Sequence, residues 1–232
     1  MLHKVLEIRN LSNTTYALRI ERKKVSFKAG QCFNLGLKNS GVNREYSIYS
    51  GENDSCLEFL VKEIKEGIVS SSLRQVTLGE EINLHGPYGS FVIDPVKIKQ
   101  VKFYLICTGT GIAPFHSFIR SHPNLDYQII NGIRFLNERY DYDEYHPLKI
   151  TTCISREKWA GFHGRLTNYL PEIPIDTKSI FYICGNQKMI QEAYVILRKK
   201  KSFRKPYFYR GFFLNFYFKV DIYLICLKKF VL

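Results

Sequence analysis

A glycine-rich stretch decides the fold of this chain: Thr108-Gly109-Thr110-Gly111-Ile112-Ala113-Pro114. It follows residues 101–107, a nearly continuous apolar run that is typical of a parallel strand buried on both faces. Residues 114–121 then have the spacing of an amphipathic helix, whose first turn accommodates Pro114 because that position needs no N–H. Glycines between a strand and a helix let the backbone approach a pyrophosphate, which the helix N-terminus attracts. An ordinary tight turn is the alternative, and the strand–loop–helix context favours phosphate binding over it.

The same alternation of strand and helix continues to about residue 201. Further apolar strands are predicted at residues 127–132, 148–154 and 180–184, with helical stretches between them and after Asn186. We therefore expect an open parallel α/β sheet, a nucleotide-binding domain, over residues 98–201. Ligands of such sheets bind at the carboxyl ends of the strands, where a second glycine-containing loop begins at Cys184; the alternative for this cysteine is a small buried core residue. The expected nucleotide contacts of the two loops are Thr108, Gly109, Thr110, Gly111, Ile112, Pro114, Cys184, Gly185, Asn186 and Met189.

Ser155 and Arg156 follow the strand at residues 148–154, at the same edge of the expected sheet. A hydroxyl and a guanidinium there can bind the ribose 2′-phosphate of NADP(H), because a guanidinium matches phosphate oxygens in a bidentate way. Arg165 is expected to add to this site. A solvated surface arginine is the alternative, and the neighbouring carboxylate of Glu157 would oppose a phosphate if it pointed the same way.

Up to about residue 97 the chain has a different pattern. Apolar and polar residues mostly alternate in six short segments, at residues 5–8, 16–20, 32–35, 46–49, 57–61 and 82–85. This period of two, with glycines beside turn residues, predicts an N-terminal antiparallel β-barrel over residues 1–97. One short helix is expected to follow Gly67.

One strand of this barrel, Arg44-Glu45-Tyr46-Ser47, brings a cation, an aromatic ring and a hydroxyl together. Residues 44 and 46 share one face of the strand, and residues 45 and 47 share the other. The short helix opens with Gly67-Ile68-Val69-Ser70, whose backbone N–H groups are a second place for an anion. Taken alone, a tyrosine in a strand is more often part of the packing.

These motifs, in this order along residues 1–200, resemble the ferredoxin–NADP reductase family, particularly its bacterial ferredoxin/flavodoxin reductase branch. The resemblance rests on Arg44-x-Tyr46-Ser47, Gly67-x-x-Ser70, the glycine stretch ending at Pro114, Ser155-Arg156 and Cys184-Gly185. It implies FAD in the barrel, with its phosphates held at Gly67 and Ser70, and NADP(H) in the α/β domain.

The resemblance also implies individual roles. Arg44 would pair with the FAD pyrophosphate, Tyr46 would pack on the flavin, and Ser47 would hydrogen-bond near flavin N5. Cys184 would lie near the nicotinamide, so Ser47 and Cys184 are the expected catalytic residues. Because the cofactors carry the chemistry and the protein positions them, no metal and no side-chain nucleophile is expected. The remaining expected cofactor contacts are Glu45, Lys62 and Val69.

The net charge of +13 suggests a nucleic acid at first, but no nucleic-acid-binding signature accompanies it. An acidic protein partner or an anionic cofactor explains the charge equally well. We therefore expect no nucleic acid, and an acidic carrier, ferredoxin or flavodoxin, as the partner of a monomer. The six cysteines are widely spaced, which excludes a zinc ribbon or a plant-type iron–sulfur module on this chain. The first residues lack the apolar core of a signal peptide, so we expect a cytoplasmic location with reduced thiols.

The pattern changes again after the lysines at residues 199–201. Residues 202–232 contain 11 aromatic residues, against 23 in the preceding 201, and follow neither a strand nor a helix period. Charged residues interrupt the apolar run, so it does not reach the length of a membrane span. Members of the resembled family end in a strand shortly after the last helix, so we interpret residues 202–232 as an aberrant tail. A shift of reading frame at the lysine codons would explain it: one permitted back-translation of residues 202–215, moved by one base, gives an ending of the family type, and the gene's bases test this.

The motifs and the resemblance together predict an FAD-dependent oxidoreductase that transfers electrons between NADP(H) and a ferredoxin or flavodoxin. A reductase component of an oxygenase and a free-flavin reductase are alternatives of the same class. A flavin-binding electron-transfer subunit, or an inactive truncated product without its last strand, is the alternative of another class. A basic nucleic-acid binder is a more distant one.

Overall fold

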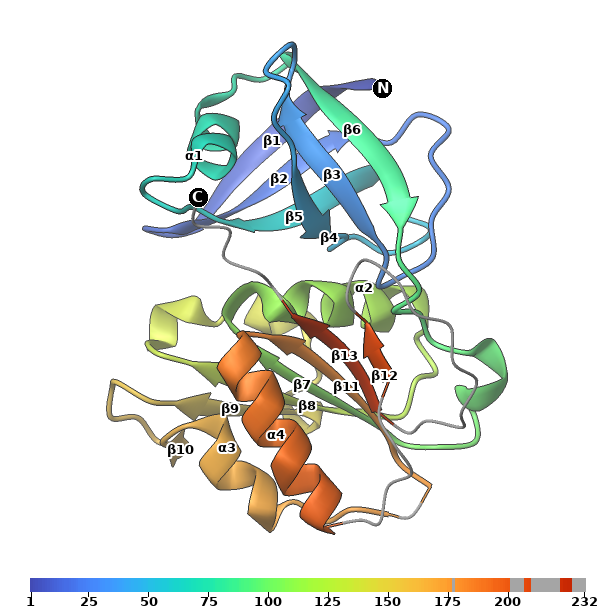
Figure 1. Ribbon diagram of the computed structural model, residues 1–232, viewed down its shortest axis with the longest axis vertical. Coiled ribbons are helices and arrows are strands. Elements are labelled where there is room, and N and C mark those ends of the chain that lie inside the picture. The colour runs from blue at the N-terminus through green and yellow to red at the C-terminus, as the bar shows by residue number, and fades with distance from the viewer. Residues whose placement is uncertain (177, 201–206, 210–221, 227–232) are drawn as a thin grey trace. The chain divides into compact units, whose positions relative to one another are not determined.

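The computed structural model describes residues 1–176, 178–200, 207–209 and 222–226 (Figure 1). Two compact units make up this part of the chain. The first contains Met1–Ile93 and Ala113–Pro123, and the second contains Asp94–Ile112 and the described residues from Asn124 onwards. An antiparallel sheet in the first unit and a parallel sheet in the second confirm the predicted fold class.

The first unit is built on six strands (Figure 1). They are β1 (Leu2–Ser12), β2 (Thr15–Glu21), β3 (Cys32–Leu37), β4 (Arg44–Ser47), β5 (Cys56–Lys62) and β6 (Glu81–Tyr88). Their order in the sheet is β4-β3-β6-β1-β2-β5. Ile48, directly after β4, forms a bridge with Phe59 of β5. The two outer strands are therefore joined, which closes the sheet into the predicted barrel.

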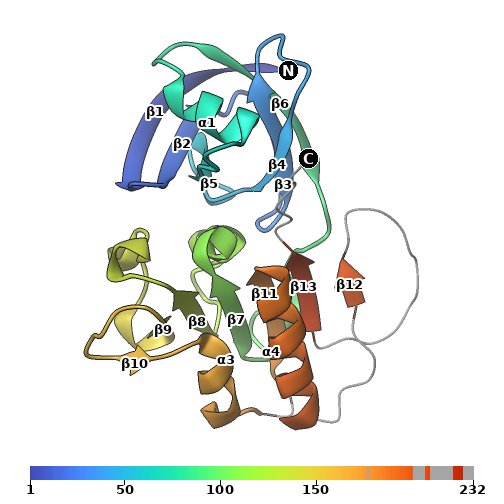
Figure 2. The ribbon, with the colours of Figure 1, turned by 60° about the vertical axis from the view of Figure 1, so that its left-hand side comes forward.

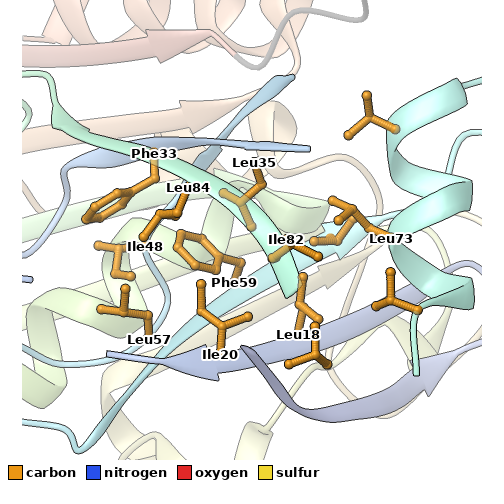
Figure 3. Close-up of a cluster of buried hydrophobic side chains, with 14 of the residues drawn as sticks. Leu18, Ile20, Phe33, Leu35, Ile48, Leu57, Phe59, Leu73, Ile82 and Leu84 are labelled. Carbon is orange, nitrogen blue, oxygen red and sulfur yellow. The ribbon is translucent and has the colours of Figure 1, made fainter. Parts of the chain in front are cut away.

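Alternating side chains of these strands fill the barrel, as the period of two predicts (Figure 3). The rings of Phe33 and Phe59 meet edge to face with centroids 5.7 Å apart. The single helix inside the barrel sequence, α1 (Ile68–Gln75), adds Leu73 to the same core. The fully buried core residues drawn from the strands include Leu18, Ile20, Phe33, Leu35, Leu57, Phe59 and Ile82.

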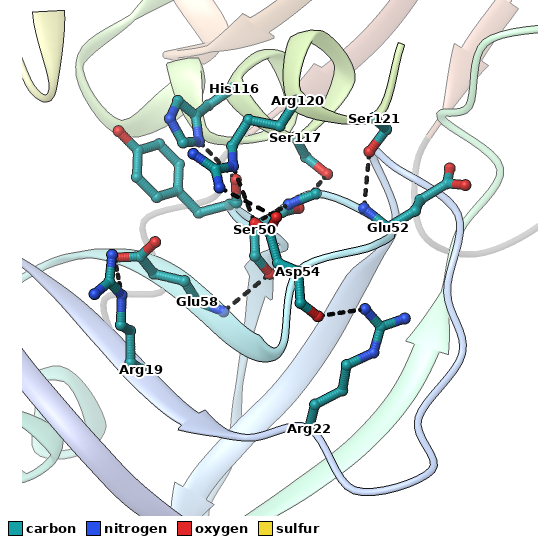
Figure 4. A network of polar contacts seen from close by, with 12 residues as sticks. Arg19, Arg22, Ser50, Glu52, Asp54, Glu58, His116, Ser117, Arg120 and Ser121 are labelled. Atoms are coloured by element: carbon teal, nitrogen blue, oxygen red, sulfur yellow. Dashed lines mark hydrogen bonds and ion pairs between the residues drawn. The ribbon is translucent and has the colours of Figure 1, made fainter. Parts of the chain in front are cut away.

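Helix α2 (Ala113–Ser121) packs with the barrel in the first unit. Its polar side bonds the turn at residues 49–54, which follows β4 (Figure 4). His116 Nδ1 lies 2.7 Å from the carbonyl oxygen of Tyr49, and the Ser117 hydroxyl donates to the carbonyl oxygen of Ser50 at 2.7 Å. The Ser121 hydroxyl oxygen accepts the N–H of Glu52 at 2.9 Å. Arg120 forms a salt bridge with the carboxylate of Asp54 at 2.9 Å. Its apolar side packs on the ring of Phe91. The sequence places this helix in residues 98–201, whereas its partners in the structure belong to the barrel.

The second unit contains a parallel sheet of seven strands within the described residues. They are β7 (Phe103–Thr108), β8 (Tyr127–Ile133), β9 (Ile150–Ile154), β10 (Phe162–His163), β11 (Ile180–Gly185), β12 (Tyr207–Tyr209) and β13 (Ile222–Cys226). The order is β10-β9-β8-β7-β11-β13-β12. Short 3₁₀ turns are η1 (Pro95–Lys97), η2 (Gly109–Ile112), η3 (Leu136–Glu138), η4 (Tyr142–Glu144), η5 (Pro147–Lys149) and η6 (Leu170–Glu172).

Helices α3 (Leu166–Tyr169) and α4 (Gln187–Lys200) lie side by side against one face of this sheet (Figures 1 and 2). Ile106, Ile130 and Ile183 from three strands form a core with Leu166 and Leu197 from the two helices. Within the described residues, no helix is long and apolar enough to cross a membrane, and no group of His, Cys, Asp and Glu is placed to hold a metal ion.

Strand β13 differs from the sequence expectation, because no regular element is predicted after residue 202. It pairs in parallel with β11, with Tyr223 opposite Tyr182 and their rings stacked 4.4 Å apart. Residues 222–226 are all apolar or aromatic, as a strand inside a parallel sheet requires. The apolar run is short and has charged residues close to both ends, so the sequence pattern did not predict a strand there. Residues 222–226 therefore form a strand beside β11, and most of the tail lies outside the described residues.

Candidate nucleotide-binding sites

Strand β4 carries the predicted flavin residues of the first unit. It pairs with β3, with Ser47 opposite Cys32 and Tyr46 opposite Phe33. Tyr46 is half-buried against the barrel core, and burial raises the pKa of its phenol to about 12. Ser47 is only 8% exposed, yet its hydroxyl reaches solvent and has no hydrogen-bond partner among the described residues. This hydroxyl is therefore available to a ligand.

The two charged residues of β4 lie on opposite faces, as the alternation of side chains predicts. Arg44 Nη1 donates to the carbonyl oxygen of Asn43 at 2.9 Å, and its charge acts on the Tyr46 phenol. Within the described residues this guanidinium has no salt bridge. Burial, with a smaller contribution from the carboxylate of Glu45, raises the pKa of the Cys32 thiol to about 12. The Arg44 cation is thus on the side of the tyrosine, and the carboxylate is on the side of Ser47.

Helix α1 begins without a capping side chain. Its N-cap is Gly67, and its first turn contains no acidic residue. The N–H groups of residues 68–70 therefore have no partner in the described part of the chain, and they are suited to bind an anion. A Cβ at position 67 would lie 2.9 Å from the Cβ of Ile64 and 3.1 Å from Oγ of Ser70, so this close turn requires glycine. Ser70 Oγ accepts the N–H of Ile64 at 3.0 Å and holds the turn in place.

Tyr16 connects α1 with β4. Its hydroxyl donates to the carbonyl oxygen of Ser70 at 2.6 Å. Burial raises the pKa of Tyr16, and Tyr46 raises it further, which places the two phenols near each other. Val69 lies in the same core as Tyr46, and Lys62 ends β5, the strand beside β2. The structure therefore brings the predicted residues of β4 and of the start of α1 into one region of the barrel.

The glycine stretch of the second unit packs directly against the carboxyl end of β11. Thr108 ends β7, and the next four residues form the turn η2. A Cβ at Gly111 would lie 2.4 Å from the carbonyl oxygen of Cys184, and a Cβ at Gly185 would lie 2.3 Å from Oγ1 of Thr108. Both positions therefore require glycine. Of the other predicted residues, Ile112 and Pro114 are buried and Thr110 is partly exposed.

The residues flanking this contact divide into an accessible backbone and a supporting layer. Gly109 has a φ of +55° and open space around it, so its backbone is accessible. Asn186 donates its N–H to Thr108 Oγ1 at 3.2 Å, and its Oδ1 accepts the N–H of Lys188 at 3.0 Å, which caps α4. Met189 is 7% exposed and lies in the core. The side chains of Asn186 and Met189 therefore support the loop.

A second group lies at the carboxyl ends of β8 and β9. The N–H and the hydroxyl of Ser155 both donate to the carbonyl oxygen of Ile133, at 3.1 and 3.2 Å. The Arg156 N–H donates to the carbonyl oxygen of Arg134 at 3.0 Å, so the residues after the two strands run together. Arg134 is absent from the sequence prediction. It follows β8 as Ser155 follows β9, and that position was the signal that could have revealed it.

The arginines at this edge are free to bind an anion. Arg165 comes just after β10, which runs parallel beside β9, so it lies at the same edge. Arg134, Arg156 and Arg165 are exposed, and none of them makes an ion pair with a residue in the described ranges. Glu157, the possible competitor, is bound to the backbone of the neighbouring segment, because its Oε2 accepts the N–H of Leu136 at 2.8 Å. Such positive charge suits a phosphate dianion.

Comparison with known proteins identifies the class of the first unit. Residues 3–93 match the family described as the oxidoreductase FAD-binding domain. This match spans the barrel strands and α1, and hence the region around Tyr46 and Ser47. The barrel is therefore an FAD-binding domain of the oxidoreductase type.

Similarity extends over most of the chain. A flavodoxin/ferredoxin–NADP reductase of Buchnera aphidicola subsp. Schizaphis graminum is 26% identical over 235 residues, which cover 87% of this chain and 91% of that protein. The toluate 1,2-dioxygenase electron transfer component of Pseudomonas putida is 24% identical, over 90% of this chain and 66% of that protein. The crystal structure of a ferredoxin NADP+ reductase from Neisseria gonorrhoeae with bound FAD and NADP has the same fold, with a TM-score of 0.78 at 23% identity over 86% of this chain and 90% of that one. Over most of its length the chain is thus similar to ferredoxin–NADP reductases and to a related electron transfer component.

The residues present fit the two cofactors of this class. In the first unit, the N–H groups opening α1 and the cation of Arg44 suit a pyrophosphate, and the Ser47 hydroxyl is accessible to a ring nitrogen. In the second unit, Gly109 leaves no side chain between the loop backbone and a dinucleotide, and Gly111 lets the loop pack closely on the end of β11.

Proposed function

We propose that this protein is an FAD-dependent oxidoreductase that transfers electrons between NADP(H) and a ferredoxin or flavodoxin. The observation that supports this proposal is that each unit has its own group of residues suited to a nucleotide. In the first unit, Tyr16 links the start of α1 with Tyr46 of β4, and in the second the glycine stretch packs on the end of β11. A reaction between two dinucleotides needs two such sites.

On the flavin side, the protein positions the cofactor. FAD, when bound, accepts a hydride from the reduced nicotinamide and releases electrons one at a time. We assign the pyrophosphate to Arg44 and the N–H groups of residues 68–70. The hydroxyl of Tyr46 stays protonated, since burial raises its pKa to about 12. The side chain therefore offers a neutral aromatic face for the flavin to pack on. We assign to Ser47 a hydrogen bond near flavin N5.

On the nicotinamide side, we assign the pyrophosphate to the backbone of Gly109, Thr110 and Gly111. Cys184 is fully buried at the end of β11, and we place it near the nicotinamide, where its small side chain leaves room for the ring. In the adjacent strand, burial raises the pKa of the Cys107 thiol well above its usual value, so that thiol remains neutral. The assigned residues bind and orient the dinucleotide and exclude water from it.

The proposed partner is an acidic carrier protein. The chain carries a net charge of +13, and residues 1–201 carry +8 of it. Such an excess attracts an acidic partner and accelerates their association. We also propose that the protein is a monomer in the cytoplasm, where the five cysteines with described side chains, all free thiols, would stay reduced.

A reductase component of an oxygenase is the second candidate, because the Pseudomonas relative is such an electron transfer component. A free-flavin reductase is a further alternative of this class. Assays of NADPH-dependent reduction with ferredoxin, flavodoxin and free FMN separate the three. Faster turnover with free FMN than with either carrier would favour the flavin reductase.

An absorbance spectrum with NADPH titration tests the proposal itself. We expect the purified protein to be yellow and NADPH to bleach the flavin bands. Yellow protein that NADPH does not bleach would instead support a flavin-binding subunit without turnover. Colourless protein without diaphorase activity would support the inactive truncated product.

A further inference from the structure

Tyr16, near the start of β2, is a fully buried tyrosine that packs against α1. Its hydroxyl donates to the carbonyl oxygen of Ser70, in the first turn of the helix, at 2.6 Å. Its ring centroid lies 5.6 Å from the guanidinium carbon of Arg74, in the last turn. One side chain of the barrel therefore contacts both ends of α1.

The first turn of α1 depends on this hydroxyl for its polar contact with the sheet. Ser70 Oγ accepts the N–H of Ile64 at 3.0 Å, and the Ser71 hydroxyl donates to the carbonyl oxygen of Gly67 at 2.5 Å. Within the described residues, such side-chain bonds of the turn stay inside residues 64–72, and Tyr16 supplies the one from a barrel strand. Loss of the Tyr16 hydroxyl would therefore loosen the turn without breaking its internal bonds.

The last turn of α1 has separate attachments to the barrel. Arg74 donates to Oδ1 of Asn10 and to the carbonyl oxygen of Asn13, both at 2.9 Å. It also forms a salt bridge with the carboxylate of Glu63. These contacts do not involve the Tyr16 hydroxyl, so removing that hydroxyl affects the first turn selectively.

Tyr16 also lies near Tyr46, the ring proposed to pack on the flavin. Both side chains pack in the barrel core. Burial raises the pKa of Tyr16 far above its ordinary value, and the Tyr46 phenol raises it further. The Tyr16 hydroxyl therefore stays protonated and continues to donate to Ser70. The two proposed flavin-binding elements, β4 and the start of α1, thus share one buried neighbour.

We propose that Tyr16 is a positioning residue that sets the separation between Tyr46 and the first turn of α1, and so favours FAD over a flavin without phosphate. This inference rests on the proposed flavin site. In FAD a ribityl chain of limited length joins the flavin ring to the pyrophosphate, so the elements that bind the two parts need a matching separation. N–H groups that are already in place bind the pyrophosphate with a smaller loss of entropy. Riboflavin has the ring and no phosphate, so its binding does not depend on α1.

Titration of FAD and of riboflavin into the full chain freed of flavin, followed by flavin fluorescence, tests the proposal. Tyr16→Phe removes only the hydroxyl and should weaken FAD binding about threefold to tenfold, the contribution of one hydrogen bond. Its affinity for riboflavin should equal that of wild type. Wild-type affinity for FAD, or equal weakening of FAD and riboflavin, would overturn the proposal.

Tyr104→Phe is the matched control for this variant. Tyr104 is a buried tyrosine of the second unit whose hydroxyl donates to the carbonyl oxygen of Pro174. The substitution therefore removes the same kind of hydrogen bond far from the proposed flavin residues in the sequence. FAD and riboflavin should both bind Tyr104→Phe as they bind wild type. Weakening of FAD in Tyr104→Phe as large as in Tyr16→Phe would contradict a specific role of Tyr16.

Hydrogen exchange in the flavin-free chain gives a readout that needs no cofactor. The Ser71 N–H donates to the carbonyl oxygen of Gly67 at 3.3 Å, at the start of α1, and should exchange several-fold faster in Tyr16→Phe. Unchanged exchange at Ser71 would contradict the positioning role. Failure of the wild-type chain to bind FAD would overturn the proposed function together with this inference. FAD binding that is insensitive to Tyr16→Phe would overturn only the inference.

Discussion

Arg156 is the residue on which the choice between NADPH and NADH depends in the proposed site. Its guanidinium is exposed, and its backbone N–H is anchored to Arg134. Arg156→Ala should raise the KM for NADPH about tenfold or more, because a hydrogen bond to a charged group contributes roughly 1.5–3 kcal/mol. The KM for NADH, which has no 2′-phosphate, should stay within about twofold. Steady-state diaphorase assays measure both constants; Lys158→Ala is the matched control, and equal effects on the two cofactors would refute the assignment.

Glu157 illustrates what residue types alone can and cannot predict. The sequence predicts a phosphate ligand at Arg156, because the chemistry of this residue and its place after a strand can both be read from the sequence. Whether the adjacent carboxylate opposes that role depends on its rotamer, and in the structure it bonds the N–H of Leu136. The same limit applies to Ser70, whose hydroxyl holds the N–H of Ile64.

His3 gives the first unit a predictable response to pH. It is fully buried, with Nδ1 2.7 Å from the carbonyl oxygen of Glu21 and Nε2 without a partner in the described ranges. Burial lowers the pKa of His3 below its ordinary 6.5. Below pH 6.5 the His3 side chain therefore binds a proton more readily in the unfolded chain than in the folded one. The free energy of unfolding is unaffected by His3 titration well above pH 6.5 and decreases as the pH falls below that value.

Thermal melts at pH values from about 7.5 down to about 5 measure this effect. Wild type should lose melting temperature more steeply than His3→Gln over that interval. His85→Gln, a change at an exposed histidine of the same barrel, should follow wild type. Parallel curves for wild type and His3→Gln would show that the pKa of His3 is the same in the folded and unfolded states.

At the scale of elements, periodicity predicted where the strands lie but not which strands pair. The segments at residues 16–20, 57–61 and 180–184 fall inside β2, β5 and β11. These patterns are local, because a strand buried on one face or on both shows it in its own residues. β10, only two residues long, and β13, between charged residues, carry too little pattern to be seen.

The contact between η2 and β11 makes Gly111 the residue most sensitive to an added methyl group. A Cβ there would meet the carbonyl oxygen and the carbonyl carbon of Cys184, at 2.4 and 2.8 Å, and neither backbone atom can move aside cheaply. Gly111→Ala should lower the free energy of unfolding by about 3 kcal/mol. Gly109→Ala, in the same turn but with open space around it, should cost about 1 kcal/mol for its left-handed backbone. Denaturant unfolding compares them, and equal losses would mean that the close approach is not maintained in solution.

At the scale of the whole molecule, the two units are not consecutive in the sequence. Residues Ala113–Pro123 belong to the first unit, although the segments on both sides of them belong to the second. A single predicted boundary near residue 97 cannot describe a unit that is made of two separate segments. The spacing of residues 114–121 specifies an amphipathic helix but not the surface it packs on. In the structure, Ser117 and Arg120 bond residues of the turn after β4, contacts that no local pattern encodes.

Net charge is the property of the whole molecule that bears most directly on its partner. The excess of +13 is spread along the chain rather than confined to one motif, so its effect on association is long-range and depends on salt. The distance over which such charges act falls from about 10 Å at 0.1 M salt to about 3 Å at 1 M. NADPH-dependent reduction of an acidic ferredoxin or flavodoxin should therefore slow about tenfold or more between roughly 0.05 and 0.5 M salt.

The same enzyme reducing a neutral quinone provides the control, because the transfer from NADPH to the flavin is common to both assays. Its rate should change little over the same range of salt, since no charge on the acceptor is screened. A decrease confined to the protein carrier would locate the salt effect in the association step, as the charge argument requires. Equal salt dependence for carrier and quinone would point to weakened NADPH binding at the arginines instead. A carrier rate that is independent of salt would exclude electrostatic attraction of an acidic partner.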